Sequence, residues 1–488
     1  MISDLSLDAR ALDRARISRD PRFDGKFFIA VKTTGVYCRP ICPSRTSHSR
    51  NVRYYPTAAA AAEAGFRPCL RCRPEAAPGT PAWMGTSAVV RRALRLIDEG
   101  VLDNASVDEL AGKLGLGSRH LRRLFLQHVG ASPIAFAQTR RLHFAKRLLD
   151  ETTLPITQIA LAAGFGSLRR FNTAFLQSYG RAPRELRKHC IDADSTDDEV
   201  ILKLAFRPPY DWDQVCGFLA AHAVPEVEQV REGGYSRTLR TLDGFAIISV
   251  HRLVDEDALE LRVRGAKPDT LFQISSAARR VFDTSADPAR TTFALRSDPL
   301  LGPRVAQRPG LRIPGEWDPF ECAVCAIVGE KDSTAARTII ASIVERLGEP
   351  IGKTCSGLTR LFPTATAIAN ADLSGLQLPK TTIATVKRLA RAIVEGEVDF
   401  SESTDCVLEA LRTVTGIAQS TAEYVALRAF GEPDAFPVGD VALRQAASDT
   451  DRPLSAQQLE ARAEAWRPWR GYAALHLWSA SLQNSKAV

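Results

Sequence analysis

The sequence lacks any apolar run of the ~18 residues that a membrane-spanning helix requires. Its first ten residues, MISDLSLDAR, contain no apolar core of the kind found in secretory signals. We therefore expect a soluble, cytoplasmic protein with no membrane partner. Hydrophobic residues make up 45% of the chain and charged residues 25%, which is ordinary globular usage and excludes wholesale disorder or a fibrous repeat.

A length of 488 residues predicts several domains, because single domains commonly hold roughly 100 to 200 residues. The charge is uneven along the chain. Residues 1–190 contain 31 Lys and Arg against 15 Asp and Glu, a net charge of +16, whereas the remainder has 33 against 41, a net charge of −8. The N-terminal part therefore has the balance of a polyanion-binding protein, with a merely well-solvated basic surface as the alternative.

The ten cysteines do not predict a disulfide framework, because cytosolic reductants keep thiols reduced. Four of them form two close pairs, Cys38-x3-Cys42 and Cys69-x2-Cys72. Two such pairs can supply four thiolates to one tetrahedral Zn²⁺, so we predict a zinc site there. The other cysteines are interpreted as packing residues: Cys190, Cys216, Cys355 and Cys406 are isolated, and Cys322 and Cys325 lie in a predicted helix with no second pair nearby.

Two sequences surround this cluster, FFIAVKTTGVYCRPICPSR at residues 27–45 and GFRPCLRCRP at residues 65–74. Over about residues 15–75 the chain resembles the N-terminal domain of the Ada family, which repairs methyl phosphotriesters in DNA. The resemblance implies that Cys38, in the YCRP motif, is both a zinc ligand and the methyl acceptor. Cys42, Cys69 and Cys72 are then the supporting ligands.

The chemistry of such a site is coherent. Four thiolates on Zn²⁺ carry a charge of about −2, which repels ordinary DNA phosphates but not a neutral methylated phosphotriester. Methylation of Cys38 removes one negative charge, so it should tighten DNA binding. A passive zinc ribbon in a transcription factor without methyl transfer is the alternative. Arginines of this region are predicted to contact neighbouring phosphates: Arg39, Arg45, Arg67, Arg71 and Arg73.

An internal repeat follows the Pro/Gly/Ala-rich segment 75–85. FLQHVGASP at residues 125–133 recurs as FLQSYGRAP at residues 175–183. Each copy follows a helix, a glycine-containing turn and a second helix predicted to open at a serine cap, Ser118 or Ser167. Ser106 to Glu109 forms a capping-box pattern, and residues 132–151 can form one connecting helix of about 20 residues, roughly 30 Å long.

This arrangement resembles the AraC-type DNA-binding domain over about residues 86–188. The resemblance implies that the second helix of each unit reads bases, with the two helices about one turn of DNA apart. Candidate base-reading residues are Arg119, His120, Arg122, Leu168, Arg169 and Asn172. Candidate phosphate contacts are Arg123, Arg140, Arg141 and Arg170.

Residues 200–283 alternate apolar and polar residues in stretches such as YSRTLRTL and FAIISVHRL, which predicts antiparallel strands with a helix on one face. From residue 284 onward the pattern is helical. Residues 410–446, ALRTVTGIAQSTAEYVALRAFGEPDAFPVGDVALRQA, resemble the helix-hairpin-helix signature of the AlkA-type 3-methyladenine DNA glycosylases. The resemblance covers roughly residues 200–485.

The resemblance implies roles for four residues. Gly416 occupies the hairpin turn, where backbone N–H groups can approach a DNA phosphate. Asp440 is the catalytic carboxylate, although it could instead simply cap the helix that follows. Tyr424 and Trp478 line the pocket for a flipped cationic base, although either could be a core residue. The lysine of lyase-competent relatives is replaced by Ser420, so we expect a monofunctional glycosylase.

Two further departures from the family pattern lie in the C-terminal half. Ala418 replaces the second hairpin glycine, and Lys331 stands where a residue normally wedges into the DNA stack. No cysteine quartet follows the hairpin, so no iron–sulfur cluster is expected. No PCHR motif is present, so an O6-methylguanine acceptor domain is not expected.

The predicted fold class is a multidomain, mainly α protein. Its predicted parts are a four-cysteine zinc domain (1–80), a double helix-turn-helix (85–188), an α+β antiparallel-sheet domain (198–283) and an all-α helix-hairpin-helix domain (284–488). The predicted function is an adaptive response to DNA alkylation that combines methyl transfer, methylation-activated transcription and excision of alkylated bases. Predicted partners are double-stranded DNA and RNA polymerase, with the protein associated with the nucleoid. In the alternative, the C-terminal half is a catalytically degenerate DNA-binding module.

Overall fold

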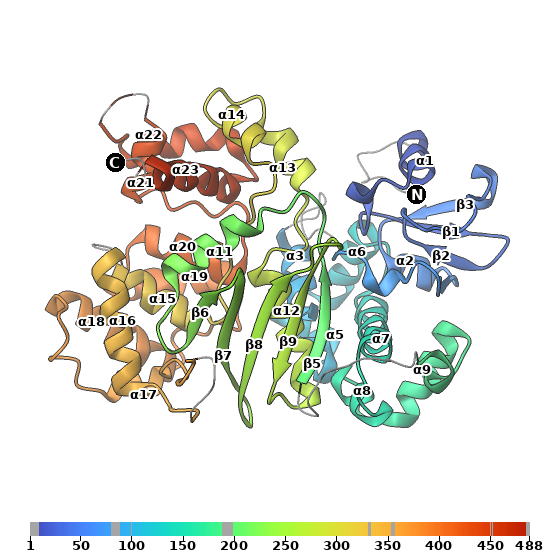
Figure 1. The fold of residues 1–488 in the computed structure, drawn as a ribbon, viewed down its shortest axis with the longest axis horizontal. Coiled ribbons are helices and arrows are strands. Elements are labelled where there is room, and N and C mark those ends of the chain that lie inside the picture. The colour runs from blue at the N-terminus through green and yellow to red at the C-terminus, as the bar shows by residue number, and fades with distance from the viewer. Residues whose placement is uncertain are drawn as a thin grey trace. The chain divides into compact units, whose positions relative to one another are not determined.

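The computed structural model describes residues 9–79, 88–98, 100–187, 199–329, 333–352, 357–448, 450 and 452–484. These residues belong to two compact units. The first comprises Met1–Pro208, Arg252–Arg279 and Thr284–Ala286, and the second comprises the rest. Helices predominate beside two small sheets, which confirms the predicted fold class (Figure 1). Within the described ranges, no helix is long and apolar enough to cross a membrane.

The first unit begins with the cysteine module, residues 9–79, built on a four-stranded sheet of order β3-β1-β2-β4. Alternation along the first strand places Phe27, Ile29 and Val31 in one buried cluster and Phe28 and Ala30 in another. Its elements are α1 (Ala9–Ser18), η1 (Pro21–Phe23), β1 (Phe28–Val31), β2 (Val36–Cys38), η2 (Ser49–Asn51), β3 (Val52–Tyr55), α2 (Ala58–Glu63), β4 (Arg67–Pro68) and η3 (Pro74–Ala76).

The start of the Pro/Gly/Ala-rich segment 75–85 is part of the folded cysteine module. Glu75 lies in η3 and is 6% exposed, so it belongs to the folded module. Its burial depends on contacts with residues more than 70 positions away, which local composition does not reveal.

Helices form the next part of the first unit: α3 (Ala88–Asp98), α4 (Val101–Asn104), α5 (Val107–Lys113), α6 (Ser118–His128), α7 (Pro133–Glu151), α8 (Ile156–Ala162), α9 (Leu168–Tyr179) and α10 (Pro183–Leu186). The predicted connecting helix is α7, with 19 residues. The capping box at Ser106 and the cap at Ser167 are confirmed. The predicted cap at Ser118 was wrong by one position, because Gly117 is the N-cap and Ser118 is the first residue of α6.

The repeated sequence ends each unit at a glycine with positive φ, Gly130 at 75° and Gly180 at 68°. A side chain at Gly130 would meet the Cβ of Ala60 at 3.0 Å, and one at Gly180 would meet the guanidinium of Arg67 at 2.5 Å. Both contacted residues belong to the cysteine module. The positive φ favours glycine at both positions, and close packing against Ala60 adds to this preference at Gly130.

Five further strands, β5 to β9, follow along the chain. In the first unit β5 pairs antiparallel with β9, and in the second unit β6, β7 and β8 form an antiparallel meander on which α11 packs. The predicted strand-rich region with a helix on one face is thus confirmed. Its elements are β5 (Glu199–Ala205), α11 (Trp212–His222), β6 (Glu228–Arg231), β7 (Gly234–Thr241), β8 (Gly244–Arg252), β9 (Ala258–Arg264), η4 (Pro268–Thr270) and α12 (Leu271–Val281).

The described residues after 287 form helices around an apolar core that includes Val324, Leu389 and Leu411. These helices are α13 (Pro288–Leu295), α14 (Leu301–Gln307), α15 (Pro319–Gly329), α16 (Ser333–Leu347), α17 (Ala365–Asn370), α18 (Lys380–Val394), α19 (Thr404–Thr413), α20 (Gln419–Phe430), α21 (Val441–Ala446), α22 (Ala456–Ala463), η5 (Glu464–Trp466) and α23 (Arg470–Asn484). Cys322 and Cys325 lie on α15 within this core, and Cys216 is buried, as predicted. Cys406 on α19 is exposed, so its interpretation as a packing residue was wrong. Cys190 and Cys355 lie outside the described residues.

Candidate functional site

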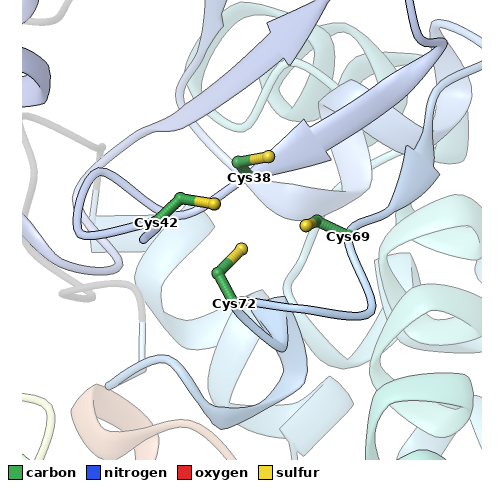
Figure 2. Close-up of side chains that lie close together, drawn as sticks. All are labelled: Cys38, Cys42, Cys69 and Cys72. Carbon is green, nitrogen blue, oxygen red and sulfur yellow. The ribbon is translucent and has the colours of Figure 1, made fainter. Parts of the chain in front are cut away.

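The four predicted zinc ligands converge at the ends of two neighbouring strands. Cys38 is the last residue of β2, and Cys69 directly follows β4, which pairs parallel with β2. The amide of Cys69 donates to the carbonyl of Tyr37 at 2.9 Å. Cys42 and Cys72 lie in the turns that follow these strands. Figure 2 shows the four side chains directed toward a common centre, and their sulfurs all lie within 4.8 Å of one another.

This donor set fits a zinc ion. Sulfurs at the corners of a tetrahedron with Zn–S bonds of about 2.3 Å lie a little under 4 Å apart, which agrees with the observed crowding. All four cysteines are free thiols. Hydrogen bonding with Cys42 raises the pKa of Cys38, whereas the same contact lowers the pKa of Cys42, so the sulfurs compete for protons at close range. A soft divalent cation held by four thiolates removes this conflict.

One of the four sulfurs accepts a hydrogen bond from the surrounding chain. Cys72 Sγ accepts from the amide of Arg39 at 3.4 Å. Cys38 is buried, with 8% of its surface exposed.

The arginines predicted to contact DNA here fall into two groups. Arg45, Arg67 and Arg71 are exposed, as that role requires. Arg39 does not fit it, because its buried guanidinium pairs with Asp24 and donates to the carbonyl of Cys72 at 3.2 Å. Arg39 instead holds the turn that carries Cys72.

Arg73 does not fit the predicted phosphate-contact role either. Its guanidinium lies 2.9 Å from Asp150 and 3.4 Å from Glu151, both on α7. The partners of Arg73 are thus acidic side chains of the helix-turn-helix region, far away in sequence.

The predicted base-reading residues all lie on the exposed faces of α6 and α9. The buried faces of these helices carry Leu121 and Phe125 in α6 and Phe171 and Phe175 in α9, each 0% exposed. This division leaves the opposite faces free for DNA. The exposed candidates are Arg119, His120, Arg122, Leu168, Arg169 and Asn172, and the phosphate candidates Arg123 and Arg170 are exposed as well.

Arg140 and Arg141 do not fit their predicted phosphate contacts, since both are engaged inside the first unit. Arg141 Nε donates to Asp103 at 2.8 Å, and Arg140 lies 3.6 Å from Asp98 and 3.6 Å from the centre of the Phe272 ring. These contacts tie α7 to the segments around it.

An open hollow of about 570 Å³ lies where α9 begins. Its lining combines basic and amide side chains, which suits a phosphate-bearing ligand. The polar and charged lining residues are Gln138, Arg141, Ser167, Arg169, Arg170, Thr173 and Gln177.

The helix hairpin of the second unit is formed by α19 and α20, with Gly416 in the turn at φ 101°. A Cβ at Gly416 would meet Thr385 Oγ1 at 2.1 Å, so only glycine fits. A Cβ at Gly439 would likewise meet Ser420 at 2.8 Å. The loop that precedes Asp440 is therefore pressed against the start of α20, next to the hairpin.

Asp440 is the N-cap of α21, and its Oδ1 accepts from the amide of Leu443 at 2.8 Å. The predicted cap is thus confirmed. Among the residues that the structure describes, no Lys or Arg forms an ion pair with this carboxylate. An uncompensated carboxylate of this kind can stabilise positive charge that develops on a nearby sugar.

The two predicted pocket aromatics lie together. The rings of Tyr424 on α20 and Trp478 on α23 meet edge to face, with centroids 6.2 Å apart. Both are partly exposed, so neither is a fully enclosed core residue. Burial raises the pKa of Tyr424, so its hydroxyl keeps its proton. Lys331, the predicted wedge, lies outside the described residues.

Sequence reasoning missed the residues behind these aromatics. Arg428, 1% exposed, donates to the hydroxyl of Tyr424, lies 2.8 Å from Glu316 and covers the ring of Phe218 at 4.5 Å. A charged residue in the apolar stretch VALRAF, one helical turn after Tyr424, was the available signal. Its partners come from distant parts of the chain, and no local pattern indicates them.

Three family models match the chain: the metal binding domain of Ada over residues 11–75, a helix-turn-helix domain over 110–189 and the AlkA N-terminal domain over 201–318. A probable bifunctional transcriptional activator/DNA repair enzyme AlkA from Mycobacterium tuberculosis is 40% identical over 96% of this chain and 95% of its own. DNA-3-methyladenine glycosylase 2 from Escherichia coli is 32% identical over 56% of this chain and 95% of its own. The bifunctional activator/repair enzyme AdaA from Bacillus subtilis is 32% identical over 36% of this chain and 81% of its own.

A four-cysteine metal centre, two helix-turn-helix units and a helix-hairpin-helix region on one chain define a DNA-binding regulator combined with a DNA glycosylase. The agreement with the mycobacterial relative extends over nearly the whole of both chains. The chain belongs to the family of bifunctional transcriptional activator/DNA repair enzymes of the AlkA type.

Proposed function

We propose that the cysteine module repairs methyl phosphotriesters in DNA and that Cys38 is the methyl acceptor. The assignment is supported by the YCRP motif around Cys38, by the match of the metal binding domain of Ada to residues 11–75 and by the four sulfurs within 4.8 Å of one another. A Zn²⁺ ion, when bound, keeps all four sulfurs as thiolates at neutral pH. Cys72 Sγ accepts a hydrogen bond from the amide of Arg39, which makes it a weaker nucleophile than a sulfur without one.

The transfer is a displacement at the methyl carbon. Cys38 Sγ forms a bond to that carbon while the bond between carbon and phosphate oxygen breaks, and the electron pair of the broken bond stays on the phosphate. The products are a Cys38 thioether and an ordinary phosphodiester anion. Because the thioether cannot be displaced by water at a useful rate, each chain reacts once.

We further propose that this transfer activates the regulator. The four sulfurs lose one negative charge on methylation, so their repulsion of DNA phosphates falls and promoter affinity rises. The exposed faces of α6 and α9 then read the promoter, and RNA polymerase is recruited to it. A protein that acts in this way works on the chromosome in the cytoplasm.

The test of the acceptor uses DNA with radiolabelled methyl phosphotriesters. Wild-type protein should take up one methyl group per chain, and Cys38→Ser should take up none. Cys406→Ser, which changes an exposed cysteine of the second unit, is the matched control and should react fully. Transfer that persists in Cys38→Ser would overturn the assignment of Cys38 as the acceptor.

For the second unit, we propose excision of alkylated purines such as 3-methyladenine. Asp440 stabilises the oxocarbenium-like sugar as the N-glycosidic bond breaks, and water completes the reaction. Tyr424 and Trp478 stack against the cationic flipped base. Ser420 cannot form a Schiff base as lysine can, so the product is an intact abasic site.

The direct experiment incubates the protein with DNA that contains defined 3-methyladenine and 7-methylguanine and follows release of the free bases. Release with no strand cleavage supports a monofunctional glycosylase. The departures at Lys331, Ala418 and Ser420 favour a second candidate, a DNA-binding module without catalysis. DNA binding with no base release, also after Lys331→Leu, would establish that candidate.

A further inference from the structure

The strands and turns that carry the cysteines pack directly on the helix-turn-helix region. Tyr37, next to Cys38 on β2, has its hydroxyl 2.9 Å from Nε2 of His143 on α7. The two rings are stacked with an interplanar angle of 29°. On the other side of the metal centre, Arg73 follows Cys72 directly and reaches Asp150 on α7 at 2.9 Å. Both cysteine segments thus have a neighbour that contacts the same long helix.

Between these contacts lies a buried charge cluster formed by Arg73, Glu75, Lys146 and Asp150. The side chains of Glu75, Lys146 and Asp150 are 1%, 5% and 0% exposed. Lys146 Nζ contacts Asp150 and lies 3.7 Å from Glu75, and Arg73 lies 3.7 Å from Glu75. Neither carboxylate oxygen of Glu75 accepts a hydrogen bond from the described residues. Its charge is therefore buried with only partial compensation.

The same cluster extends to the second recognition helix. Tyr179 is the last residue of α9, is 4% exposed, and its hydroxyl has no hydrogen-bond partner among the described residues. Helix α9 also packs against β4, the strand that ends directly before Cys69. Beside them, the guanidinium of Arg67 lies against Gly180, the C-cap of α9. A cation at this end of a helix is favoured by the helix dipole.

We propose that this interface, formed by Tyr37, Arg67, Arg73 and Glu75 against His143, Lys146, Asp150 and Tyr179, transmits the methylation state of the cysteines to helix α9. The inference rests on the proposed methyl transfer to Cys38. It adds a second route to activation beside the direct repulsion between the sulfurs and DNA. Methylation tightens the interface and so fixes α9 in the orientation that binds the promoter.

The physical reason is the sign of the charges. Glu75 stands three residues after Cys72 and is buried, and the proposal takes the negative sulfur group and this carboxylate to repel each other where little water screens them. Removal of one negative charge from the sulfurs lowers this repulsion, and the pairing of Glu75 with Lys146 and Arg73 becomes stronger. The methylated and unmethylated cysteines thus differ in how strongly they stabilise this interface. Because the interface also contacts α9, the cysteine site and α9 are coupled.

Glu75→Gln tests the proposal, because the amide keeps the shape of the side chain and removes the repelled charge. Asp20→Asn is the matched control, since Asp20 is a cysteine-module carboxylate that pairs with exposed Arg22. Each protein is measured before and after methylation, for methyl uptake, for promoter affinity at one fixed salt concentration and for hydrogen exchange of residues 168–180. His143→Phe, which keeps the stacked ring and loses the hydrogen bond to Tyr37, is a second variant in case Glu75→Gln folds poorly.

Wild type and Asp20→Asn should gain promoter affinity on methylation and become more protected at residues 168–180. In Glu75→Gln the unmethylated protein should already bind more tightly, and the gain on methylation should fall about fivefold or more. His143→Phe should also show a smaller gain. If Glu75→Gln and His143→Phe take up methyl groups normally and show the wild-type gain, the interface transmits nothing and the proposal is overturned. Absence of methyl uptake in wild type would instead overturn the proposed repair function.

Discussion

Replacement of Asp440 separates two roles that one carboxylate carries. Oδ1 accepts the cap hydrogen bond from Leu443 at 2.8 Å, and no described cation neutralises the charge. Asp440→Asn keeps an acceptor of equal capping strength and removes the charge. Asp440→Ala removes both. The two variants should therefore agree in activity and differ in stability.

The magnitudes follow from these contacts. Loss of one preorganised charge-stabilising group commonly lowers a rate by about 10² to 10³, or roughly 3 to 4 kcal/mol of barrier. Both variants should show this loss in excision. Loss of the cap costs about 1 kcal/mol, which lowers the midpoint of thermal unfolding by about 2 to 4 °C in a unit of this size. Only Asp440→Ala should show that shift.

The assay is single-turnover release of 3-methyladenine from defined DNA, with thermal unfolding measured on the same preparations. Ser455→Ala is the matched control, because it removes the cap of α22 and leaves the predicted site unchanged. It should lower the unfolding temperature and retain excision. Excision by Asp440→Asn at the wild-type rate would refute the role of the charge and leave Asp440 as a cap alone.

Three further outcomes are expected. Purified protein should contain one zinc per chain, and Cys69→Ser should lose both the zinc and the methyl uptake. Metal analysis and the radiolabel assay on the same protein can show this. Methyl uptake by metal-free protein would contradict the activation of the thiolate by zinc. Arg169→Ala should weaken promoter binding by about 1 to 3 kcal/mol more than non-specific binding. Arg170→Ala should weaken both kinds of DNA binding equally and lower the dependence of DNA affinity on salt. Binding titrations at several salt concentrations distinguish the two variants. Burial lowers the pKa of His143 to about 4, so the unfolded chain takes up a proton near pH 6.5 that the folded chain does not bind. The free energy of unfolding should therefore fall by about 2 kcal/mol between pH 7 and pH 5. Denaturant unfolding of His143→Gln should show a weaker dependence of this free energy on pH.

Features that depend on local sequence were predicted well. The two cysteine pairs, the capping box at Ser106, the length of α7 and the turn at Gly416 are each encoded within a few neighbouring residues. Short-range geometry determines such features, so they can be predicted from the sequence alone.

Features that depend on distant partners were missed. Arg39 resembles a phosphate contact in sequence, and only the fold brings Asp24 beside it. Glu75 resembles a linker residue until Lys146 of α7 is packed against it. Arg428 is a buried arginine whose acceptors in Pro314 and Glu316 are separated from it by more than a hundred residues. Burial of a charge is a property of the assembled unit, and it has no signature in local composition.

The two glycines that end the repeated helices, Gly130 and Gly180, have a consequence for the DNA that this protein can recognise. Each one abuts a different residue of the cysteine module, Ala60 for the first and Arg67 for the second. The spacing of α6 and α9 is therefore constrained by α7 and by these contacts with the cysteine module. If α6 and α9 read two half-sites as proposed, we expect the cysteine module to limit the half-site spacings that the protein can bind.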